Sequence, residues 1–432
     1  MTSRAGIVVT GTEVLTGRVV DRNGPWLAER LRELGVDVGR TVVVGDRRED
    51  LAAALRFQLA DHDLVLTTGG LGPTADDLTA EVVAEVQGRV LRLDEALEEQ
   101  VGAIVARLNA RRGWSPPAEA TRHSVRKQAL VPEGASVLPP VGTAPGLVVP
   151  GPEGRPPVVV LPGPPSELQP MWPTALATGA VRAALAGAEE LRQSETRLWG
   201  PPEAELAALL RAHEEAHGSL EDAGLEVTTC VRDGELEVVT RYRPAAAAAH
   251  DRLQAALREH FGTQVYADDG RGLDEVLADL LLARGATIAT AESCTAGLLA
   301  GRLADRAGSS AYLVGGFVTY ANAAKTAELG VPAALIEEHG AVSREVAEAM
   351  ARGARERLGT SVGVGVTGIA GPGGGTAQKP VGLVHVAVDV DGTTRHRELR
   401  LGGDRSTVRR RTVVAALHLV RAALERPGTM EG

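Results

Sequence analysis

The chain has 432 residues, of which 44% are hydrophobic, with a formal net charge of −10 and a pI near 5.6. This length predicts two or three domains, and the acidic balance argues against non-specific binding to nucleic acid or to an anionic membrane. The two cysteines, Cys230 and Cys294, are too few for a disulfide framework or a cysteine-rich metal site.

The N-terminal segment, Met1 to Ala5, has no charged-then-apolar signal sequence. No run of about 18 apolar residues is present to span a bilayer. We therefore expect a soluble, cytoplasmic protein.

The first part of the chain alternates strand-like and helix-like patterns at the spacing of a parallel α/β sheet. The expected strands lie at 7–9, 41–44, 64–67 and 158–161, and the expected helices at 25–35 and 49–59. Several of these strands end in glycine-rich loops, the places where open α/β sheets bind ligands.

Residues 175–268 have a different character. Two β-branched runs, 227–231 and 236–240, are separated by Asp233-Gly234, which predicts a hairpin. Helical patterns flank it at 203–216 and 245–260. This region is expected to form a small α+β module, with a linker at 268–272.

From Leu273 onward strand and helix patterns alternate again and predict an α/β/α sandwich. The expected strands are at 287–290, 311–319, 361–366, 381–390 and 395–401. The expected helices are at 294–307, 343–358 and 406–424.

Lys325 is the first candidate for chemistry in this last region. It is one of only three lysines among 46 basic residues, and it shares the segment 319–325 with Tyr320 and Asn322, which are also rare residue types here. A buried lysine can lose its proton and act as a base, whereas an arginine cannot. Chance clustering is the alternative.

Ser293 is the second candidate, because it lies where a strand is expected to end and a helix to begin. Its hydroxyl could simply cap that helix. Alternatively, it could be a nucleophile whose oxyanion faces free backbone N–H groups at the helix start. A neutral lysine amine can replace histidine as the base, so Lys325 is the candidate base and Tyr320 a candidate proton relay. Cys294 is expected to pack inward.

A glycine-rich loop at 367–375 follows another apolar strand, and its backbone could approach an anion closely. Arg405, just before the last helix, could hold a phosphate or could be one more solvated arginine.

Three motifs together resemble the nicotinamide-nucleotide amidase domain of the CinA family: Ser293-Cys294-Thr295, Tyr320-x-Asn322-x-x-Lys325 and the 367–375 loop. The resemblance implies hydrolysis of nicotinamide mononucleotide to nicotinate mononucleotide and ammonia, without a cofactor. Ser293 would be the nucleophile, Lys325 its base and Tyr320 a helper. The residues expected to bind substrate are Thr295, Asn322, Thr367, Gly368, Ala370, Gly371, Gly373 and Arg405. Ala296 stands where the family pattern has a second glycine.

The segment 67–79 resembles the signature of the family's molybdopterin-binding-like domain, and the loops 11–13 and 161–167 match it further. The glycines can admit a pyrophosphate, and Asp77 could ligate Mg²⁺ or another divalent cation, or could merely cap a helix beginning near Thr79. The resemblance implies a site for ADP-ribose or a related nucleotide. Its expected residues are Gly11, Glu13, Gly69, Gly70, Gly72, Thr74, Asp76 and Gly163.

The middle module resembles the KH-like insert of the same family but lacks a Gly-x-x-Gly loop. We therefore expect no nucleic acid partner, and a scaffold or dimer-contact role that makes a homodimer plausible. The predicted organisation is a molybdopterin-binding-like α/β/α domain at 1–174, a KH-like α+β module at 175–268 and an α/β/α amidase domain at 269–432.

Two alternative functions stay open. The chain could act mainly as a Mg²⁺-dependent ADP-ribose pyrophosphatase. It could also be a non-catalytic nucleotide-binding regulator of competence or of the DNA damage response.

Overall fold

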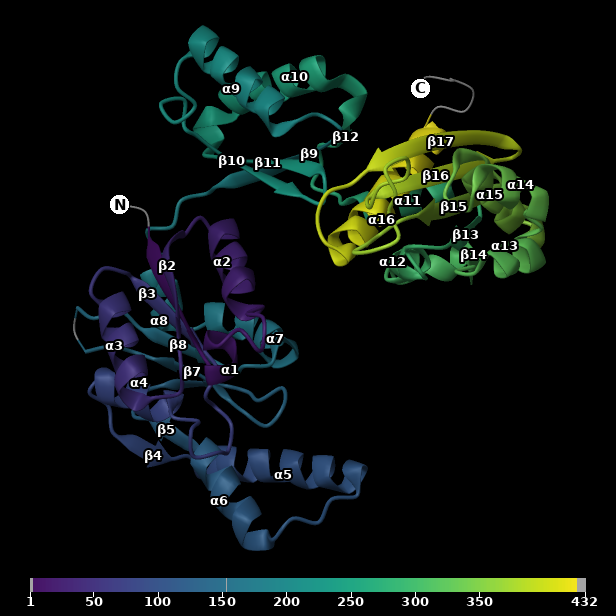
Figure 1. Cartoon of the computed structure of the whole chain (residues 1–432). Helices are drawn as coiled ribbons and strands as arrows, with labels where there is room; N and C mark the ends of the chain where they lie inside the picture. The colour runs from purple at the N-terminus through teal and green to yellow at the C-terminus, as the bar shows by residue number, and fades with distance from the viewer. Residues whose placement is uncertain (1–2, 153, 426–432) are drawn as a thin grey trace. The chain divides into compact units, whose positions relative to one another are not determined.

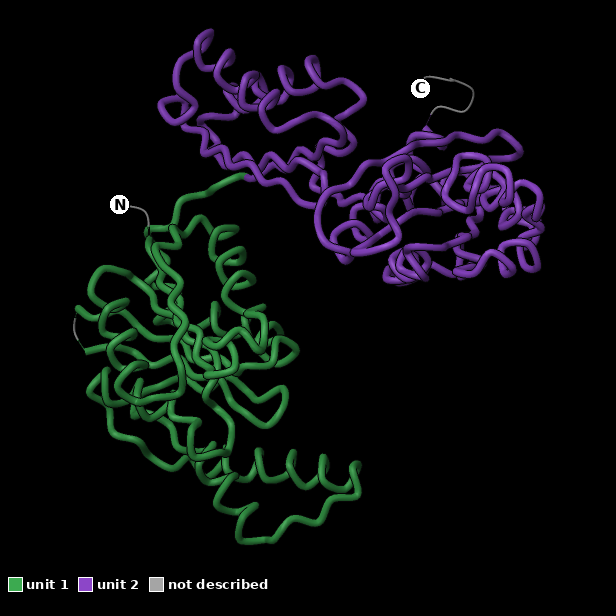
Figure 2. The backbone as a smooth tube through the Cα atoms, in the orientation of Figure 1, with its two compact units in different colours: residues 1–192 green, residues 193–432 purple. Residues whose placement is uncertain are grey.

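The computed structural model describes residues 3–152 and 154–425, and the chain divides into two compact units, Met1–Arg192 and Gln193–Gly432 (Figure 2). Met1 and Thr2, part of the segment that was expected to lack a signal sequence, lie outside the described residues. Residues 426–432 of the expected amidase domain lie outside them as well. Within the described ranges, no helix has both the length and the apolar character that crossing a bilayer requires.

The first unit is built on a six-stranded sheet in the order β2-β1-β3-β8-β7-β6 (Figure 1). The strands β2, β1, β3 and β8 are parallel, whereas β7 and β6 add on in antiparallel fashion. The carboxyl ends of four strands therefore meet at one edge. The sheet strands are β1 (Arg4–Thr10), β2 (Asp37–Val44), β3 (Leu64–Thr68), β6 (Ser136–Leu138), β7 (Gly146–Val149) and β8 (Val158–Leu161).

Helices cover both faces of this sheet, as expected for an α/β/α domain. On one side, α2 (Asn23–Glu33), α7 (Pro165–Leu176) and α8 (Gly179–Ala184) contribute to one apolar cluster; on the other, α3 (Arg48–Leu59) and α4 (Thr79–Val86) contribute to a second. The remaining elements are α1 (Thr12–Leu15), α5 (Glu95–Arg112), α6 (Ala118–Gln128), β4 (Leu91–Leu93) and β5 (Leu130–Pro132).

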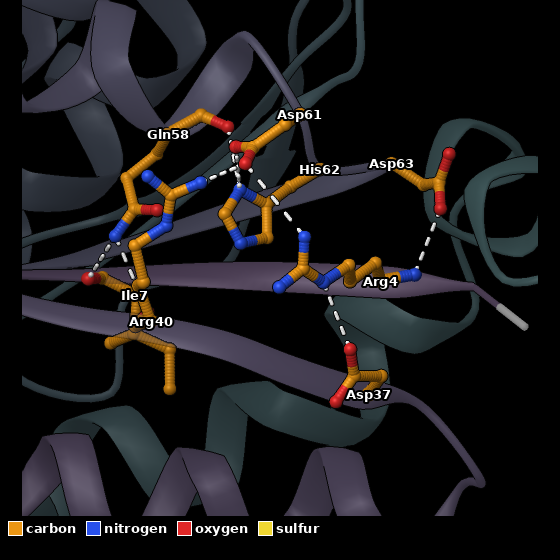
Figure 3. Close-up of polar contacts among 8 residues, drawn as sticks. All are labelled: Arg4, Ile7, Asp37, Arg40, Gln58, Asp61, His62 and Asp63. Atoms are coloured by element: carbon orange, nitrogen blue, oxygen red, sulfur yellow. Dashed lines mark hydrogen bonds and ion pairs between the residues drawn. The ribbon is translucent and has the colours of Figure 1, made fainter.

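A polar network ties the amino ends of these strands together (Figure 3). Gln58 donates from Nε2 to the carbonyl oxygens of Ile7 and Arg40, at 3.1 and 3.3 Å, and so links α3 to β1 and β2. The backbone N–H of Arg4 donates to Asp63 and its Nε to Asp37, at 2.8 and 2.9 Å. These contacts thus join β1 and β2 to α3 and to Asp63, directly before β3.

The second unit begins with the α+β module. Its antiparallel sheet has the order β10-β11-β9-β12, and α9 and α10 share its apolar core. The predicted hairpin is confirmed: Asp233 and Gly234 connect the two strands with φ values of 51° and 95°, as a tight two-residue turn requires. The elements are β9 (Arg192–Trp199), α9 (Glu203–His217), β10 (Leu225–Arg232), β11 (Glu235–Tyr242), α10 (Ala247–Phe261) and β12 (Val265–Ala267).

The rest of the second unit is a three-layer sandwich around a five-stranded sheet in the order β14-β13-β15-β16-β17. The helices α11, α12 and α16 pack on one face, and α13, α14 and α15 on the other (Figure 1). The strands are β13 (Ile288–Glu292), β14 (Leu313–Val318), β15 (Val362–Gly368), β16 (Leu383–Val390) and β17 (Thr393–Arg400). The helices are α11 (Leu273–Ala283), α12 (Leu298–Ala304), α13 (Asn322–Leu329), α14 (Ala333–His339), α15 (Arg344–Leu358) and α16 (Arg405–Glu425).

The α+β module contacts α16 through a buried polar cluster. His418 of α16 is 1% exposed, stacks on Trp199 with ring centroids 4.2 Å apart, and donates from Nε2 to Glu235 at 2.9 Å. Tyr266 meets the same imidazole edge-on and also donates to Glu235, at 2.7 Å. The cluster joins three strands of the module to one helix of the sandwich.

Candidate active site

The turn that carries Ser293 begins where β13 ends. The expected helix at 294–307 is wrong at both ends, because α12 spans Leu298–Ala304 and has Gly297 as its N-cap. Ala296 and Gly297 have φ values of 50° and 90°, and a left-handed backbone cannot continue into a right-handed helix. Ser293 therefore lies in a turn before the helix and does not cap it.

Glu292, the residue before the nucleophile candidate, binds the free backbone N–H groups at the start of α12. Its carboxylate is fully buried and accepts the backbone N–H groups of Gly297, Leu299 and Ala300 at 2.9, 3.1 and 2.8 Å. These donors of the first helical turn are therefore not open to a substrate oxyanion. The sequence reasoning missed Glu292, although an acid at the end of an apolar strand was a usable signal.

Two other backbone N–H groups remain available beside Ser293. The N–H of Ser293 itself donates to the carbonyl of Val366 at 2.9 Å. The N–H groups of Cys294 and Thr295 donate to no acceptor within residues 3–152 and 154–425. Free donors next to a nucleophile can stabilise the oxyanion of a tetrahedral intermediate.

Lys325 lies on α13 and is 1% exposed. Its Nζ is 3.2 Å from Ser293 Oγ, and 2.9 and 3.3 Å from the carbonyl oxygens of Thr319 and Tyr320. Since carbonyl oxygens only accept hydrogen bonds, a neutral amine would use its two N–H groups on them and turn its lone pair to the Ser293 hydroxyl. Burial lowers the pKa of Lys325, which favours that neutral form.

The phenol of Tyr320 lies at the exposed rim of the site. The residue is 56% exposed, and its hydroxyl accepts a hydrogen bond from Nη2 of Arg405 at 2.9 Å. Its contact with Lys325 is through the backbone carbonyl. The structure thus joins Tyr320 to the residue that was expected to hold a phosphate, and within the described chain no hydrogen bond joins the phenol to Ser293 or Lys325.

Arg405 also reaches the glycine-rich loop, because its Nη1 donates to the carbonyl of Gly371 at 2.9 Å. Gly371 has a φ of 82°, and the peptide bond that follows it is cis. Thr367 directs its hydroxyl away from this contact, to the carbonyl of Ala341 at 2.7 Å. Of the other expected loop residues, Gly368 ends β15, Ala370 is buried in the core and Gly373 is exposed.

Three further predicted residues differ in their surroundings. Thr295 is fully buried, and its hydroxyl has no hydrogen-bond partner among the described residues. Asn322 is exposed at the start of α13. Cys294 packs in the hydrophobic core as expected, and burial raises the pKa of its thiol to about 11, so it is not a thiolate at neutral pH.

Arg409 is a second charged residue that the sequence reasoning missed. From α16 it donates through Nε to the carbonyl of Cys294 at 3.1 Å and through Nη2 to that of Thr295 at 2.7 Å. Among 43 arginines it carried no local signal, since the turn that it contacts lies more than 100 residues earlier.

The first unit has a cavity of about 750 Å³ at the carboxyl edge of its sheet. Of the residues expected there, Gly11, Glu13, Gly69, Gly70, Gly72, Asp76, Asp77 and Gly163 line it. Asn23, which no motif singled out, ties the wall together by donating from Nδ2 to Thr68 Oγ1 at 2.9 Å and to the Gly163 carbonyl at 2.6 Å. At Gly69, with a φ of 101°, a Cβ would lie 2.3 Å from the Thr10 carbonyl oxygen, so the close approach requires glycine.

Thr74 does not line this cavity, although it was expected in the nucleotide site. Its hydroxyl donates to Asp76 and Asp77, and its backbone N–H donates to Asp77 Oδ2 at 2.8 Å. Asp77 therefore closes the turn that begins at Thr74. It does not cap α4, because the N-cap residue of that helix is Leu78 and no side chain caps it.

The cavity is acidic, with carboxylates contributed by Glu13, Asp21, Asp46, Asp76, Asp77 and Glu167. In the described residues no group of three or more His, Cys, Asp or Glu side chains is arranged to hold a metal. A cation that takes one or two carboxylates and completes its shell with phosphates and water still fits this wall. The hydrogen bond from Thr74 lowers the pKa of Asp76, which keeps this carboxylate ionised.

Comparisons with known proteins agree with the two-unit architecture. A family model described as "CinA C-terminal domain" matches residues 271–424, and one described as "Probable molybdopterin binding domain" matches residues 6–180. A CinA-like protein of Mycobacterium sp. (strain MCS) is 56% identical, over 98% of this chain and 100% of its own length. A CinA-like protein of Mycobacterium tuberculosis (strain ATCC 25177 / H37Ra) is 52% identical over 98% of both chains.

Among solved structures, a competence/damage inducible protein from Agrobacterium tumefaciens, named CihA, is 47% identical to the aligned part of this chain. The match covers 36% of this chain and 98% of that one, with a TM-score of 0.34.

Proposed function

The chain belongs to the CinA family, and from this premise we propose that its C-terminal sandwich is a nicotinamide-nucleotide amidase. The reaction is hydrolysis of nicotinamide mononucleotide to nicotinate mononucleotide and ammonia. The observation that carries the proposal is the 3.2 Å contact between Lys325 Nζ and Ser293 Oγ, two buried side chains, with two backbone carbonyl oxygens as the other partners of the amine. The substrate is supported by the likeness of the motifs around Ser293, Tyr320 and Lys325 to those of the family.

In the first step the Ser293 hydroxyl attacks the carboxamide carbon while Lys325 takes its proton. The N–H groups of Cys294 and Thr295 hold the developing oxyanion, an effect worth about 3–4 kcal/mol per donor in other enzymes. Lys325 then passes the proton to the departing nitrogen, which leaves as ammonia and gives an ester on Ser293. Water, deprotonated by the same amine, cleaves the ester and restores the serine.

Arg405 and Tyr320 form the binding side of this site. Arg405 holds the Gly371 carbonyl and the Tyr320 hydroxyl with its two Nη atoms, which fixes a guanidinium and an aromatic ring at the exposed rim. A guanidinium suits the nucleotide phosphate, and an aromatic face suits the pyridine ring. No metal takes part in this proposed reaction.

The test is ammonia release from nicotinamide mononucleotide by the full chain, with and without EDTA. We expect release that EDTA leaves unchanged and that Ser293→Ala reduces to background. An absence of ammonia from the intact protein at high enzyme concentration contradicts the proposal.

The cavity of the first unit supports a second candidate function. This is hydrolysis of the pyrophosphate bond of ADP-ribose or a related nucleotide, with Mg²⁺ or another divalent cation. Its size of about 750 Å³ suits a nucleotide, and its glycines open the backbone to a pyrophosphate. Asp77, the predicted ligand, and Asp76 beside it both line the cavity and would hold the cation, which when bound would neutralise phosphate charge beside the acidic wall. AMP release that EDTA abolishes is the expected result.

EDTA distinguishes the two proposed activities, because only the second depends on a cation. If pyridine nucleotides bind to the protein but neither ammonia nor AMP accumulates, the alternative of a non-catalytic nucleotide-binding regulator is the better description. A homodimer is also proposed, and light scattering of the full chain measures it directly.

A further inference from the structure

The turn from Ser293 to Gly297 contains a strained residue. Within the described residues, three non-glycine residues have positive φ: Asp233, Ala296 and Asp391. The two aspartates sit in hairpin turns, where a short polar side chain favours this conformation. Ala296 has no such side chain, and the left-handed conformation costs an alanine free energy that the surroundings must offset.

Two charged residues hydrogen-bond to the backbone before and after Ala296. Glu292 accepts the N–H groups of Gly297, Leu299 and Ala300, all within 3.1 Å. Arg409 donates to the carbonyl oxygens of Cys294 and Thr295. One charge thus holds amide hydrogens that follow Ala296, and the other holds carbonyl oxygens that precede it.

This arrangement decides where the free N–H groups point. The C=O and N–H of a trans peptide group point in opposite directions, so Arg409 on the Cys294 carbonyl directs the N–H of Thr295 away from itself. The carbonyl of Ser293 accepts the N–H of Ala296 at 3.2 Å, which likewise directs the N–H of Cys294. The two N–H groups that remain free are therefore oriented by contacts elsewhere in the turn.

We propose that Glu292 and Arg409 are positioning residues for Ser293 and for the oxyanion donors at Cys294 and Thr295. Neither forms a hydrogen bond with the Ser293 hydroxyl or the Lys325 amine in the described chain, so both act through the backbone of the turn. The inference rests on the proposed amidase function. It assigns to these two charges an effect on the rate of the chemical step, with substrate affinity left largely intact.

The test compares Arg409→Gln, Arg409→Lys and Glu292→Gln with a matched control, Arg410→Gln. Arg410 is the next residue on α16 and is exposed; its partners are Ser406, Thr407 and, in an ion pair at 3.7 Å, Asp233, none of which belongs to the turn. For Arg409→Gln and Glu292→Gln we expect kcat for ammonia release to fall by roughly tenfold or more, with KM within about twofold. Arg409→Lys should recover part of the rate, because an ammonium can still reach a carbonyl, and the control should match the parent.

A second variant separates positioning from general loss of structure. Ala296→Gly removes the cost of the left-handed conformation, so adding it to Arg409→Gln should restore part of kcat. Unchanged kcat in both Arg409→Gln and Glu292→Gln overturns the proposal, and so does a KM effect that accounts for the whole loss.

Two measurements judge the proposal without the natural substrate. Hydrogen exchange at Gly297, Leu299 and Ala300 should accelerate in Glu292→Gln, and labelling of Ser293 by a fluorophosphonate should slow in both variants. If the parent releases no ammonia, the proposed function fails on its own, and these two rates still decide the positioning role. Exchange and labelling rates equal to those of the parent overturn it.

Discussion

Lys325 Nζ lies 3.2 Å from Ser293 Oγ, although the two residues are 32 positions apart, Ser293 in the turn after β13 and Lys325 on α13. The other two contacts of the amine are carbonyl oxygens, which fix its direction without giving it a negative partner. A buried amine with no carboxylate beside it is more easily deprotonated than an ordinary lysine. The two side chains therefore have the chemical groups and the spacing expected of a nucleophile and its general base.

The pH dependence of the amidase should follow this amine. Burial lowers the pKa of Lys325 from its ordinary value near 10.5, and only the deprotonated form can accept the serine proton. We therefore expect kcat/KM to rise with pH through a midpoint below 10.5, because the proton is lost as pH increases. A pH profile of kcat/KM measures it, and a rate that falls with increasing pH in that range contradicts the assignment.

Cys294 should be dispensable. Its thiol is buried, with a pKa of about 11, so it is protonated at neutral pH and is not a nucleophile. We expect Cys294→Ala to keep activity within about threefold of the parent while losing roughly 1 kcal/mol of stability from the missing core contact. Loss of activity comparable with that of Ser293→Ala would instead favour a cysteine hydrolase.

Ala296→Gly should stabilise the second unit. A left-handed conformation costs an alanine roughly 1–2 kcal/mol, and glycine avoids this cost while losing part of the gain to its greater freedom in the unfolded chain. We expect a net increase of up to about 1 kcal/mol, or roughly 2 °C in the transition of this unit. Calorimetry of the two proteins measures it; a lower transition temperature for the variant contradicts the strain.

His418 should make the second unit less stable in acid. Burial lowers the pKa of this imidazole to about 4, against the opposing hydrogen bond to Glu235. Between pH 6.5 and about 4 the unfolded chain binds a proton that the folded chain does not, so the free energy of unfolding falls as pH falls, by roughly 3 kcal/mol in total.

His418→Gln is the matched control for that titration, since its amide can still donate to Glu235 but does not bind a proton in this range. Denaturant unfolding at several pH values should show a shallower loss for the variant than for the parent. Equal slopes in the two proteins would rule out His418 as the source.

Local patterns predicted those elements whose signals were local. The hairpin at Asp233-Gly234 and the strand at Val158–Leu161 follow from turn residues and apolar runs. The helix at 294–307 was wrong because Ala296 and Gly297 have positive φ values, which a right-handed helix does not contain. An alanine carries no such signal by itself.

The nucleophile and base candidates of the site could be predicted from the sequence, whereas the arginines that contact the surrounding backbone and Tyr320 could not. The rarity of lysine in this chain drew attention to Lys325, and its family-like motif linked it to Ser293. Arg409 was hidden among many arginines, and the partner of the Tyr320 hydroxyl, Arg405, is 85 residues away in sequence. Contacts of this kind depend on how α16 packs against the sheet, which no local window contains.

The exchange of Lys325 for arginine tests the central claim most directly. Lys325→Arg keeps a positive charge and a long side chain but has no form that accepts a proton at neutral pH, and Lys127→Arg makes the same exchange in the other unit as a control. The account predicts that ammonia release from nicotinamide mononucleotide falls by roughly a thousandfold in Lys325→Arg, with an unchanged circular dichroism spectrum, and stays at the parent rate in Lys127→Arg. Turnover by a folded Lys325→Arg protein within tenfold of the parent would contradict it.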